Sequence, residues 1–350
     1  MKVIIISPSS IFGGGENHIV TLVNRIRKSP ISVYCLNEEL FNRLQNIENV
    51  KAQIFKTKIS LFFFMFSLLF SKGKHIVLNG LSESRFLSLL FIFKKYTLIS
   101  HSAEEWGSKF DVGYKKKLRT KINCFLLNYR SKQVVTVCEY ARKNLCLNLP
   151  SAKITLIYNT TDRRLDSVKH VSSNVDKPIT FGYLGRLSEE KGIHVLLSAI
   201  NNINCSKDIN IVIAGSGKLS SEINFPSYSR LGINVEYLGF VDSDFFFSSV
   251  DCLLLPSLTE ACPLVVIEAM SKKVPTIASD VGGVPELVQH GVSGYLFPKE
   301  DSLKLSQYIE DIVSDERRLE FFKKNAELIF ESKFNPEVFV KKYNEVLFNE

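Results

Sequence analysis

Short apolar runs of strand length alternate with longer amphipathic segments along most of the 350-residue chain. This alternation is typical of βαβ units, in which a helix links two parallel strands. In the first half we predict strands at Val3–Ser7, Ser32–Leu36, Ala52–Phe55, His75–Leu78, Thr97–Ser100, Val134–Val137 and Ile154–Tyr158. In the second half we predict strands at Ile179–Leu184, Ile209–Ala214, Val235–Leu238, Cys252–Leu255, Thr276–Ala278 and Tyr295–Phe297. Because these runs are apolar throughout, we predict the α/β class, with two Rossmann-like domains on mostly parallel sheets covered on both faces.

The length of the chain predicts more than one domain, because a single hydrophobic core rarely grows beyond roughly 250–300 residues. The stretch before Pro178 has no apolar periodicity and is rich in serine and arginine, as a linker would be. We therefore predict an N-terminal domain at residues 1–165, a linker at 166–177 and a C-terminal domain at 178–333. Residues 334–350 have helical apolar spacing and are predicted to form a closing helix that packs back toward the first domain.

Charge is distributed unevenly along the chain. Residues 1–175 carry 27 Lys and Arg against 11 Asp and Glu, and the remaining residues carry 17 against 25. A basic half attracts phosphates, whether of nucleic acid, of anionic lipid headgroups or of a pyrophosphate-linked substrate. Charge alone does not choose among these, and many of the lysines also fit an ordinary solvated surface. With 45% apolar and 23% charged residues, the composition excludes a disordered or fibrous chain.

The segment from Ile59 to Phe70, ISLFFFMFSLLF, is the most apolar part of the chain. A helix that spans a bilayer needs about 20 residues, so this segment is too short to cross one. We favour a buried helix of the first domain and keep a membrane-interface patch as the alternative. The nearby basic run Lys115–Lys121 supports that alternative, since stable surface attachment usually needs two signals.

Cysteine usage and the N-terminal residues indicate the compartment. The seven cysteines form no CxxC pair and are odd in number, so we expect neither disulfides nor a zinc site. The apolar run at Lys2–Ser7 has the length of a strand and is followed by Pro8, unlike a secretory signal. We expect a cytoplasmic protein, with peripheral attachment to the inner face of the cytoplasmic membrane as an option.

Two glycine-containing clusters follow predicted strands. Gly13-Gly14-Gly15-Glu16 comes after the first strand, where glycines let the backbone approach a ligand, although a bare turn has the same composition. Gly185-Arg186-Leu187-Ser188-Glu189-Glu190-Lys191-Gly192 comes after the strand at Ile179–Leu184. An arginine and a lysine at a strand end could clamp a diphosphate without a metal. The alternative is a solvated loop with ordinary charges.

Two further segments complete the pattern. Gly215 lies in Ala214-Gly215-Ser216-Gly217, which closes a strand and either approaches a nucleotide or forms a simple turn. Glu260 precedes Pro263, which we place in the first turn of a helix, and Glu268 lies about two turns along that helix. The start of such a helix offers free N–H groups and a positive dipole to an anion.

The run from Glu260 to Glu268, two glutamates separated by seven residues, resembles the signature of glycosyltransferase family 4. Other family features lie in the expected order from about residue 1 to residue 345: Gly13-Gly14-Gly15-Glu16, His101, Val137-Cys138-Glu139, Tyr158-Asn159, Gly185-Arg186, Lys191-Gly192, Gly215-Ser216-Gly217, Leu238-Gly239-Phe240, Pro256-Ser257, Gly282-Gly283-Val284-Pro285-Glu286 and Gly291-Val292-Ser293-Gly294. Two positions depart from the pattern: Ser102 stands where an acidic residue is common, and Cys138 where a serine is common.

The resemblance implies a GT-B fold in which the second domain holds a nucleotide-sugar donor. In that pattern Arg186 and Lys191 match the pair that binds the diphosphate. Glu268 matches the carboxylate on the ribose, and Glu260 matches the residue that contacts the donor sugar. The backbone of Pro263, Leu264 and Val265 would meet phosphate and sugar, and we include Gly215 among the donor-binding residues.

The same resemblance assigns the first domain to the acceptor. Gly14 and Gly15 fall where a loop approaches the donor phosphates, and Glu16 and His101 fall on the acceptor side. We expect Glu260 and His101 to be the catalytic residues. On its own, a histidine at a strand end is often structural.

These features predict a retaining, metal-independent hexosyltransferase that needs no cofactor beyond its co-substrate, a UDP- or GDP-linked sugar. The acceptor we expect is a saccharide, lipid-linked, in the assembly of capsule, O-antigen or exopolysaccharide, with an anionic membrane surface as a possible partner and no nucleic acid. One alternative is a nucleotide-sugar epimerase of the same architecture. Another is a non-catalytic polyanion-binding protein that uses the basic half.

Overall fold

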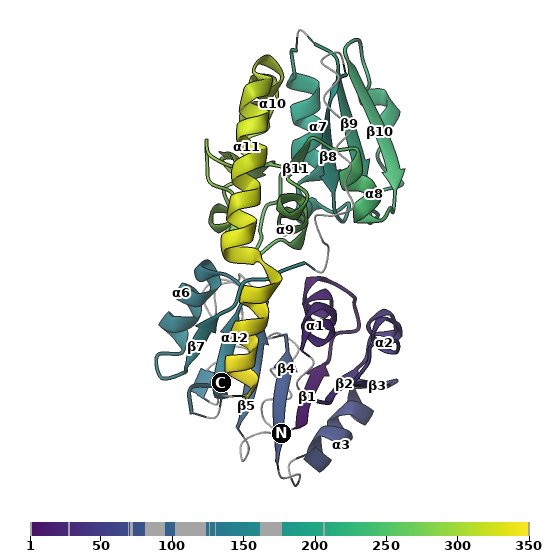
Figure 1. The fold of residues 1–350 in the computed structure, drawn as a ribbon. Coiled ribbons are helices and arrows are strands. Elements are labelled where there is room, and N and C mark those ends of the chain that lie inside the picture. The colour runs from purple at the N-terminus through teal and green to yellow at the C-terminus, as the bar shows by residue number, and fades with distance from the viewer. Residues whose placement is uncertain are drawn as a thin grey trace. The chain divides into compact units, whose positions relative to one another are not determined.

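The fold is given by a computed structural model (Figure 1). It describes residues 2–26, 29–68, 70, 73–80, 95–101, 124–125, 127–129, 131–161, 177–205 and 207–348. The chain divides into two compact units: a first unit of Met1–Thr160 with Pro336–Glu350, and a second unit of Thr161–Asn335. The basic run Lys115–Lys121, Ser102 and all of the predicted linker except Lys177 lie outside the described residues.

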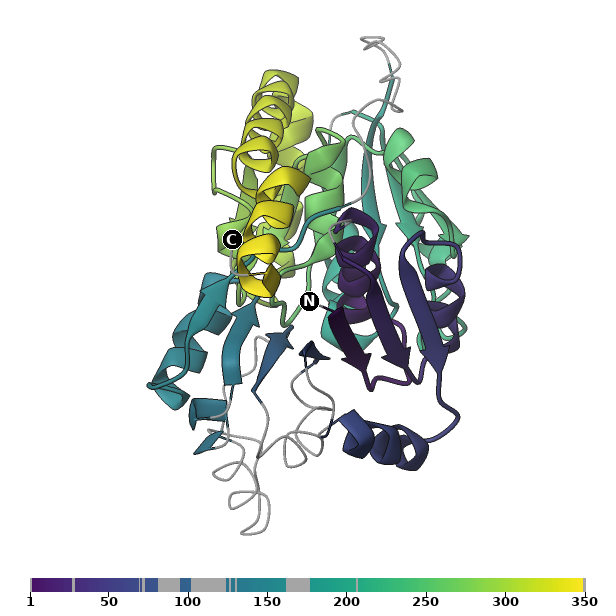
Figure 2. The ribbon, with the colours of Figure 1, turned by 60° about the horizontal axis from the view of Figure 1, so that its bottom comes forward.

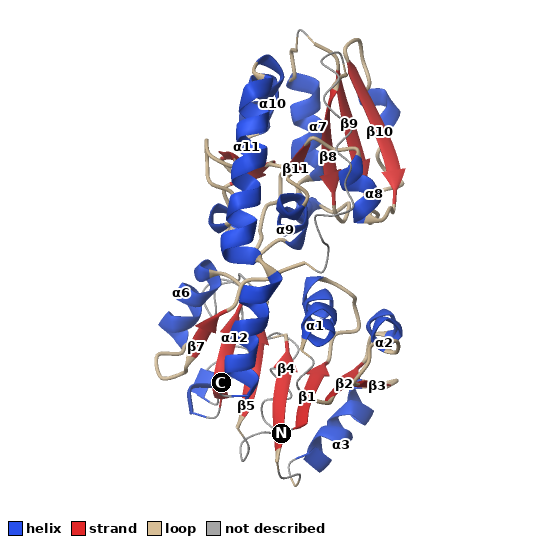
Figure 3. Ribbon diagram, viewed as in Figure 1, coloured by secondary structure: helices blue, strands red, loops and turns tan. Residues whose placement is uncertain are grey.

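The described strands of the first unit form a seven-stranded parallel sheet in the order β3-β2-β1-β4-β5-β6-β7 (Figure 3). The strands are β1 (Lys2–Ser7), β2 (Ile31–Cys35), β3 (Val50–Ile54), β4 (Lys74–Asn79), β5 (Tyr96–Ser100), β6 (Ser131–Thr136) and β7 (Ile154–Leu156). Each overlaps a strand predicted from the sequence, so the predicted parallel sheet is confirmed.

Helices cover both faces of this sheet, because successive side chains of a strand point to opposite sides. On β1, Val3 and Ile5 pack with α1 (Gly14–Arg25), α2 (Glu38–Leu44) and α12 (Pro336–Phe348). Ile4 and Ile6 point the other way and pack with α3 (Lys58–Leu68) and α6 (Glu139–Asn148). Figure 2 shows α3 (blue) and α12 (yellow, at the C-terminus) on opposite sides of the sheet.

The C-terminal helix α12 belongs to the first unit, as predicted. Its residues Phe339, Tyr343, Val346 and Leu347 are buried in the core that α1 and β1 also line. The chain therefore starts and ends in the same unit.

The second unit contains a six-stranded parallel sheet in the order β10-β9-β8-β11-β12-β13. The strands are β8 (Ile179–Leu184), β9 (Ile209–Ala214), β10 (Ile233–Gly239), β11 (Cys252–Leu255), β12 (Thr276–Ser279) and β13 (Gly294–Phe297). Its helices are α7 (Ile193–Asn202), α8 (Ser243–Ser248), α9 (Leu264–Ser271), α10 (Ser302–Ser314) and α11 (Glu316–Ile329). Shorter helical turns are η3 (Glu189–Lys191), η4 (Phe225–Tyr228), η5 (Val284–Glu286) and the π-helical turn η6 (Phe330–Phe334). The predicted pair of Rossmann-like, parallel α/β domains is thus confirmed.

The apolar segment Ile59–Phe70 forms most of α3, but only part of it is buried. Leu61, Met65 and Leu68 lie in the core, whereas Phe63 and Phe66 are 68% and 49% exposed. The predicted helix is present, and it is buried along one stripe rather than on all sides. Within the described part of the chain, no helix is long and apolar enough to cross a bilayer.

Candidate functional site

The strand order of the second unit marks where a ligand would bind. From β8 the chain first proceeds to β9 and β10 on one side and then crosses to β11 on the other, so the order reverses between β8 and β11. In open parallel sheets the crevice at such a switch point, at the carboxyl ends of the strands, is the usual ligand site. Arg186 and Lys191 follow β8, and Glu260 and α9 follow β11. These predicted donor-binding residues therefore flank the switch point.

Lys191 and Glu260 are in direct contact at this point. The Nζ atom of Lys191 lies 2.7 Å from Oε1 of Glu260, and the Oγ–H of Ser257 donates to the same oxygen at 2.9 Å. The side chain of Glu260 is only 9% exposed and that of Lys191 is 26% exposed. The carboxylate is thus held by two donors in a largely shielded place, where a hydrogen bond to a charged group is stronger than in water.

Arg186 lies in the same loop but is placed differently. Its side chain is 62% exposed, and its guanidinium pairs with Glu190, four residues away, at 3.3 Å. The main-chain oxygen of Arg186 accepts a hydrogen bond from the buried Tyr183 hydroxyl at 2.9 Å. The backbone of Arg186 is therefore anchored while its charged group remains open to solvent, as a group that meets an incoming anion would be.

Glycines let the loops of this site pack on one another. Gly192, Gly215 and Gly282 all have positive φ values, of 68°, 126° and 55°. An added Cβ would lie 1.8–1.9 Å from a main-chain oxygen in each case: that of Pro256 for Gly192, of Gly185 for Gly215 and of Glu260 for Gly282. A larger residue is incompatible with these contacts. Gly215, predicted to approach a nucleotide, is thus also required by the contact with the loop after β8.

The helix after Glu260 begins one residue later than predicted. Pro263 precedes the helix as its N-cap, with φ −65° and ψ 117°, instead of occupying the first turn. Among the described residues no side chain caps this end, so the N–H groups of Leu264 and Val265 lie in an uncapped first turn of α9. Glu268 is the fifth residue of α9, little more than one turn along rather than two, and is partly buried.

The first unit has an equivalent switch point between β1 and β4. Gly14 and Gly15, which follow β1, are the first two residues of α1. Glu16 comes next and is only 6% exposed. One of its carboxylate oxygens accepts from the N–H of Gly13 at 3.1 Å, and the other accepts from the Ser7 hydroxyl at 3.1 Å. Glu16 therefore ties the start of α1 to the end of β1, as in a capping box.

Asn79, at the end of β4, connects this network to His101. Its amide nitrogen donates to the Ser7 hydroxyl at 3.0 Å and to the main-chain oxygen of Gly15 at 3.3 Å. Because a carbonyl can only accept, the Oδ1 atom of Asn79 must be the one facing Nε2 of His101, at 2.7 Å. His101 therefore donates through Nε2–H, which leaves Nδ1 as the hydrogen-bond acceptor of the neutral ring. Gly15 fits against this ring, since an added Cβ would lie 3.1 Å from Cδ2 of His101.

A second histidine supports the first. The rings of His18 and His101 meet edge to face with centroids 4.9 Å apart. His18 is buried and bonds through Nδ1 to Asn159 at 2.8 Å and through Nε2 to the Tyr343 hydroxyl at 2.6 Å. Burial lowers the pKa of His18 to about 4. Burial, with a smaller effect of His18, lowers the pKa of His101 well below its usual value. Both rings are thus neutral at physiological pH.

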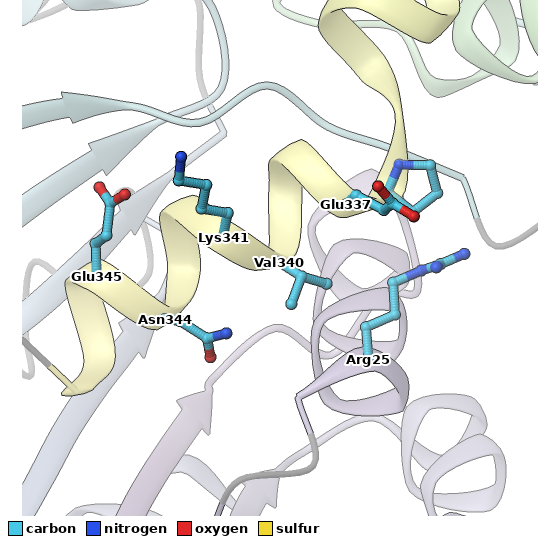
Figure 4. Close-up of a pocket in the computed structure, with 7 residues that line it drawn as sticks. Arg25, Glu337, Val340, Lys341, Asn344 and Glu345 are labelled. Atoms are coloured by element: carbon cyan, nitrogen blue, oxygen red, sulfur yellow. The ribbon is translucent and has the colours of Figure 1, made fainter. Parts of the chain in front are cut away.

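A hollow of about 540 Å³ lies elsewhere on the first unit, between the end of α1 and α12 (Figure 4). Its walls carry Arg25, Pro336, Glu337, Val340, Lys341, Asn344 and Glu345. None of the predicted site residues lines it. In the part of the chain that the structure describes, no cluster of three or more His, Cys, Asp or Glu side chains could hold a metal ion.

Several residues of the two sites carry no predicted role. Ser257 and Gly282 hold Glu260, while Ser7 and Asn79 hold Glu16 and His101. Asn79 offers a signal that the sequence contains, namely a polar residue at the carboxyl end of an apolar strand. Ser257 belongs to the Pro256-Ser257 pair noted in the sequence, and its contact with Glu260, three residues away, is local. The contact of Ser7 with Asn79 depends on β1 and β4 being neighbours and carries no such signal.

Known proteins resemble this chain in sequence. Residues 166–329 match the family described as glycosyl transferases group 1. This segment contains Arg186, Lys191, Glu260 and Glu268. An uncharacterised glycosyltransferase of Methanocaldococcus jannaschii is 29% identical over 58% of this chain and 56% of its own length. The capsular polysaccharide biosynthesis glycosyltransferase CapM of Staphylococcus aureus is 29% identical over 45% of this chain and 42% of its own. The chain thus spans about half the length of these two relatives.

Solved structures extend the likeness to the whole chain. HepE of Anabaena in complex with UDP is similar with a TM-score of 0.82 at 19% identity, covering all of both chains. The same protein with UDP-glucose is similar with a TM-score of 0.79. At this identity the likeness concerns the fold alone, which is the GT-B fold with two Rossmann-like α/β domains.

Proposed function

We propose that this chain is a retaining glycosyltransferase of family 4 that moves a sugar from a nucleoside-diphosphate sugar to a saccharide acceptor. The observation that carries the proposal is the contact of Lys191 with Glu260 at the switch point of the second unit, within the segment that matches the glycosyltransferase family. A cation beside an oriented carboxylate supplies the two functions that such a donor needs: charge for its diphosphate and hydrogen-bond acceptors for its sugar hydroxyls.

The donor would be held by residues from both sides of the switch point. Lys191 has three N–H donors, so it can keep its bond to Glu260 and still donate to a phosphate oxygen. Arg186 would exchange Glu190 for the diphosphate, an exchange that costs little because the pair is exposed. The uncapped start of α9 adds N–H groups and a partial positive charge. Glu268 would bind the ribose hydroxyls.

In the reaction we propose, the acceptor hydroxyl attacks the anomeric carbon from the face that the diphosphate leaves. The new glycosidic C–O bond forms as the bond to the diphosphate oxygen breaks, and the hydroxyl proton passes to the departing phosphate. Arg186, Lys191 and the helix dipole stabilise the charge that develops on the diphosphate. The ring of His101 is neutral, and its Nδ1 atom would accept a hydrogen bond from the saccharide substrate. No step in this scheme uses a metal ion.

The substrates we propose are a UDP- or GDP-linked hexose and a lipid-linked saccharide, in the assembly of a bacterial surface polysaccharide. HepE has been solved with UDP-glucose, and CapM is named for capsular polysaccharide biosynthesis, so UDP-sugars are the first donors to test. The excess of lysine and arginine over acidic residues in residues 1–175 fits an acceptor with a pyrophosphate and a peripheral place at the inner face of the membrane.

The test is an assay of purified protein with a panel of UDP- and GDP-sugars, with and without lipid-linked saccharides. We expect acceptor-dependent release of the nucleoside diphosphate and, by NMR, an anomeric configuration equal to that of the donor. Product formed from donor alone would instead identify an epimerase. Inversion of the anomeric centre would contradict the retaining mechanism.

A further inference from the structure

Helix α3, together with Phe70 two residues beyond its end, presents a row of large apolar side chains to solvent. Ile59, Phe63, Phe66 and Phe70 are 69%, 68%, 49% and 77% exposed. They are spaced by four, three and four residues, so they lie along one side of the helical direction. Exposed apolar rows of this kind mark interaction sites more often than ordinary surface.

The composition of α3 does not match its burial. Apart from Lys58, only Ser60 and Ser67 interrupt an apolar sequence from Lys58 to Leu68. A helix that is apolar all round is normally enclosed by protein or by lipid. Here one side of α3 packs on the core, with Phe62 and Phe64 partly buried against it, and the side that carries Phe63 and Phe66 is exposed.

The exposed large apolar side chains of the first unit are concentrated on one side of its sheet. The elements that pack on the same core cluster as α3 also expose large side chains: Phe125 and Tyr129 from helical residues around Leu127, and Tyr140 and Leu147 from α6. Within the described residues, α1, α2 and α12 on the opposite side expose no large apolar side chain. The asymmetry indicates that this side of the first unit meets a different medium.

The charged residues near α3 indicate which medium this side of the first unit meets. Lys51, Lys56 and Lys58, just before or at the start of α3, are exposed. A second copy of the chain would bring the same lysines together, which is unfavourable. Anionic lipid headgroups complement them, and an amphipathic surface that combines aromatic side chains with lysines is the usual way to bind the interface of such a bilayer.

We propose that α3 docks the first unit on the surface of an anionic lipid bilayer. Ile59, Phe63, Phe66 and Phe70 enter the boundary between headgroups and acyl chains, and the lysines meet lipid phosphates. Attachment is peripheral, because α3 has 11 residues and a span needs about 20. The docking rests on the peripheral membrane place proposed above and assigns it to a surface, but it requires neither donor nor acceptor and is therefore tested separately from the transfer reaction.

Vesicle flotation of the full chain tests this docking, with phosphatidylcholine vesicles that contain or lack phosphatidylglycerol. We expect wild type to float with the anionic vesicles and less with the neutral ones. The double variant Phe63→Ser/Phe66→Ser should lower the partition coefficient at least about tenfold, since each exposed aromatic side chain loses its burial in lipid. Lys56→Gln and Lys58→Gln should each lower it about fivefold on anionic vesicles alone.

The matched control is Phe245→Ser/Phe321→Ser, which removes two phenylalanines of the second unit that are 61% and 52% exposed. It should float like wild type. Circular dichroism and binding of UDP, in the absence of vesicles, report folding and the donor site independently of docking. Absence of wild-type flotation, or equal flotation of both double variants, would overturn the proposal. So would a dimer in sedimentation velocity that only Phe63→Ser/Phe66→Ser dissociates, because the occupant would then be a second copy.

Discussion

The ammonium group of Lys191 lies 2.7 Å from the carboxylate of Glu260, although the two residues follow different strands of the second unit. Both side chains are mostly shielded, and Ser257 donates to the same carboxylate oxygen. The contact fixes the carboxylate beside the place where an anion would bind. Catalysis benefits from such preorganisation, because groups already in position need not reorganise in the transition state.

Replacing each of the two glutamates by alanine should change a different kinetic constant. We expect Glu260→Ala to lower kcat by about 10²–10³, the usual cost of losing a preorganised electrostatic contact. Glu268→Ala should mainly raise the KM for the donor, by about tenfold or more, since hydrogen bonds of a charged group contribute about 1.5–3 kcal/mol. Steady-state kinetics with varied donor measures both, with the exposed Glu222→Ala as control. Unchanged kinetics in both variants would contradict the assigned roles.

The loop that holds the main chain of Glu260 should be sensitive to a single methyl group. Gly282→Ala places a Cβ 1.9 Å from the Glu260 main-chain oxygen, at φ 55°. Gly291→Ala is the matched control, because its φ is 73° and no atom lies within 4 Å of the added Cβ. In both variants, alanine at a positive φ costs about 1–2 kcal/mol in backbone strain. Only Gly282→Ala should also displace Glu260 and lower kcat/KM, measured at a temperature where both variants are folded.

The bond from His101 to Asn79 gives a test through pH. Asn79→Asp would place a carboxylate 2.7 Å from Nε2 of His101, and an opposite charge at that distance raises a histidine pKa by about 1–3 units. His101 would then take up a proton at a higher pH than in wild type. We expect the acid limb of the kcat/KM profile to move upward in this variant. Asn202→Asp, at an exposed position of α7, should leave the profile unchanged; an equal shift in both would show that His101 is not involved.

Buried histidines should make folding stability depend on pH. Burial, reinforced by the charge of Lys132, lowers the pKa of His75 to about 4, and burial lowers that of His18 to about 4. Between the unfolded value of about 6.5 and the folded value, the unfolded chain binds more protons, so stability falls as pH falls. At pH 5 the loss is about 2 kcal/mol per histidine.

Urea unfolding at pH 7 and pH 5 measures this loss. His75→Gln should reduce the difference between the two pH values by about 2 kcal/mol, and the exposed His194→Gln should not change it. A stability that is equal at both pH values in wild type would contradict the burial of neutral histidines.

The sequence allowed the strands and the location of the candidate site to be predicted, for a physical reason. Buried parallel strands are apolar on both faces, so they stand out, and motifs that follow them must lie at the carboxyl edge of a sheet. The contact of Lys191 with Glu260 follows from that rule once β8 and β11 are neighbours.

What the sequence did not reveal depends on long-range contacts and on side-chain conformation. The sequence did not show that the two carboxylate oxygens of Glu16 accept bonds that join α1 to β1, one of them from a serine nine residues away. Arg186 pairs with Glu190 at the surface, a choice among rotamers that no motif specifies. The exposure of Phe63 was equally hidden, because a helix that is apolar on every side has no periodicity to indicate its outer face.

Binding of UDP to the second unit tests the central claim most directly. A ligand that binds only the folded state raises its stability according to its concentration and Kd. We predict that UDP raises the Tm of wild type in a saturable manner, and that Arg186→Met/Lys191→Met abolishes the shift while Lys207→Met, at an exposed pair with Glu316, retains it. An undiminished shift in the double variant, or no shift in wild type with any nucleoside diphosphate, would contradict the account.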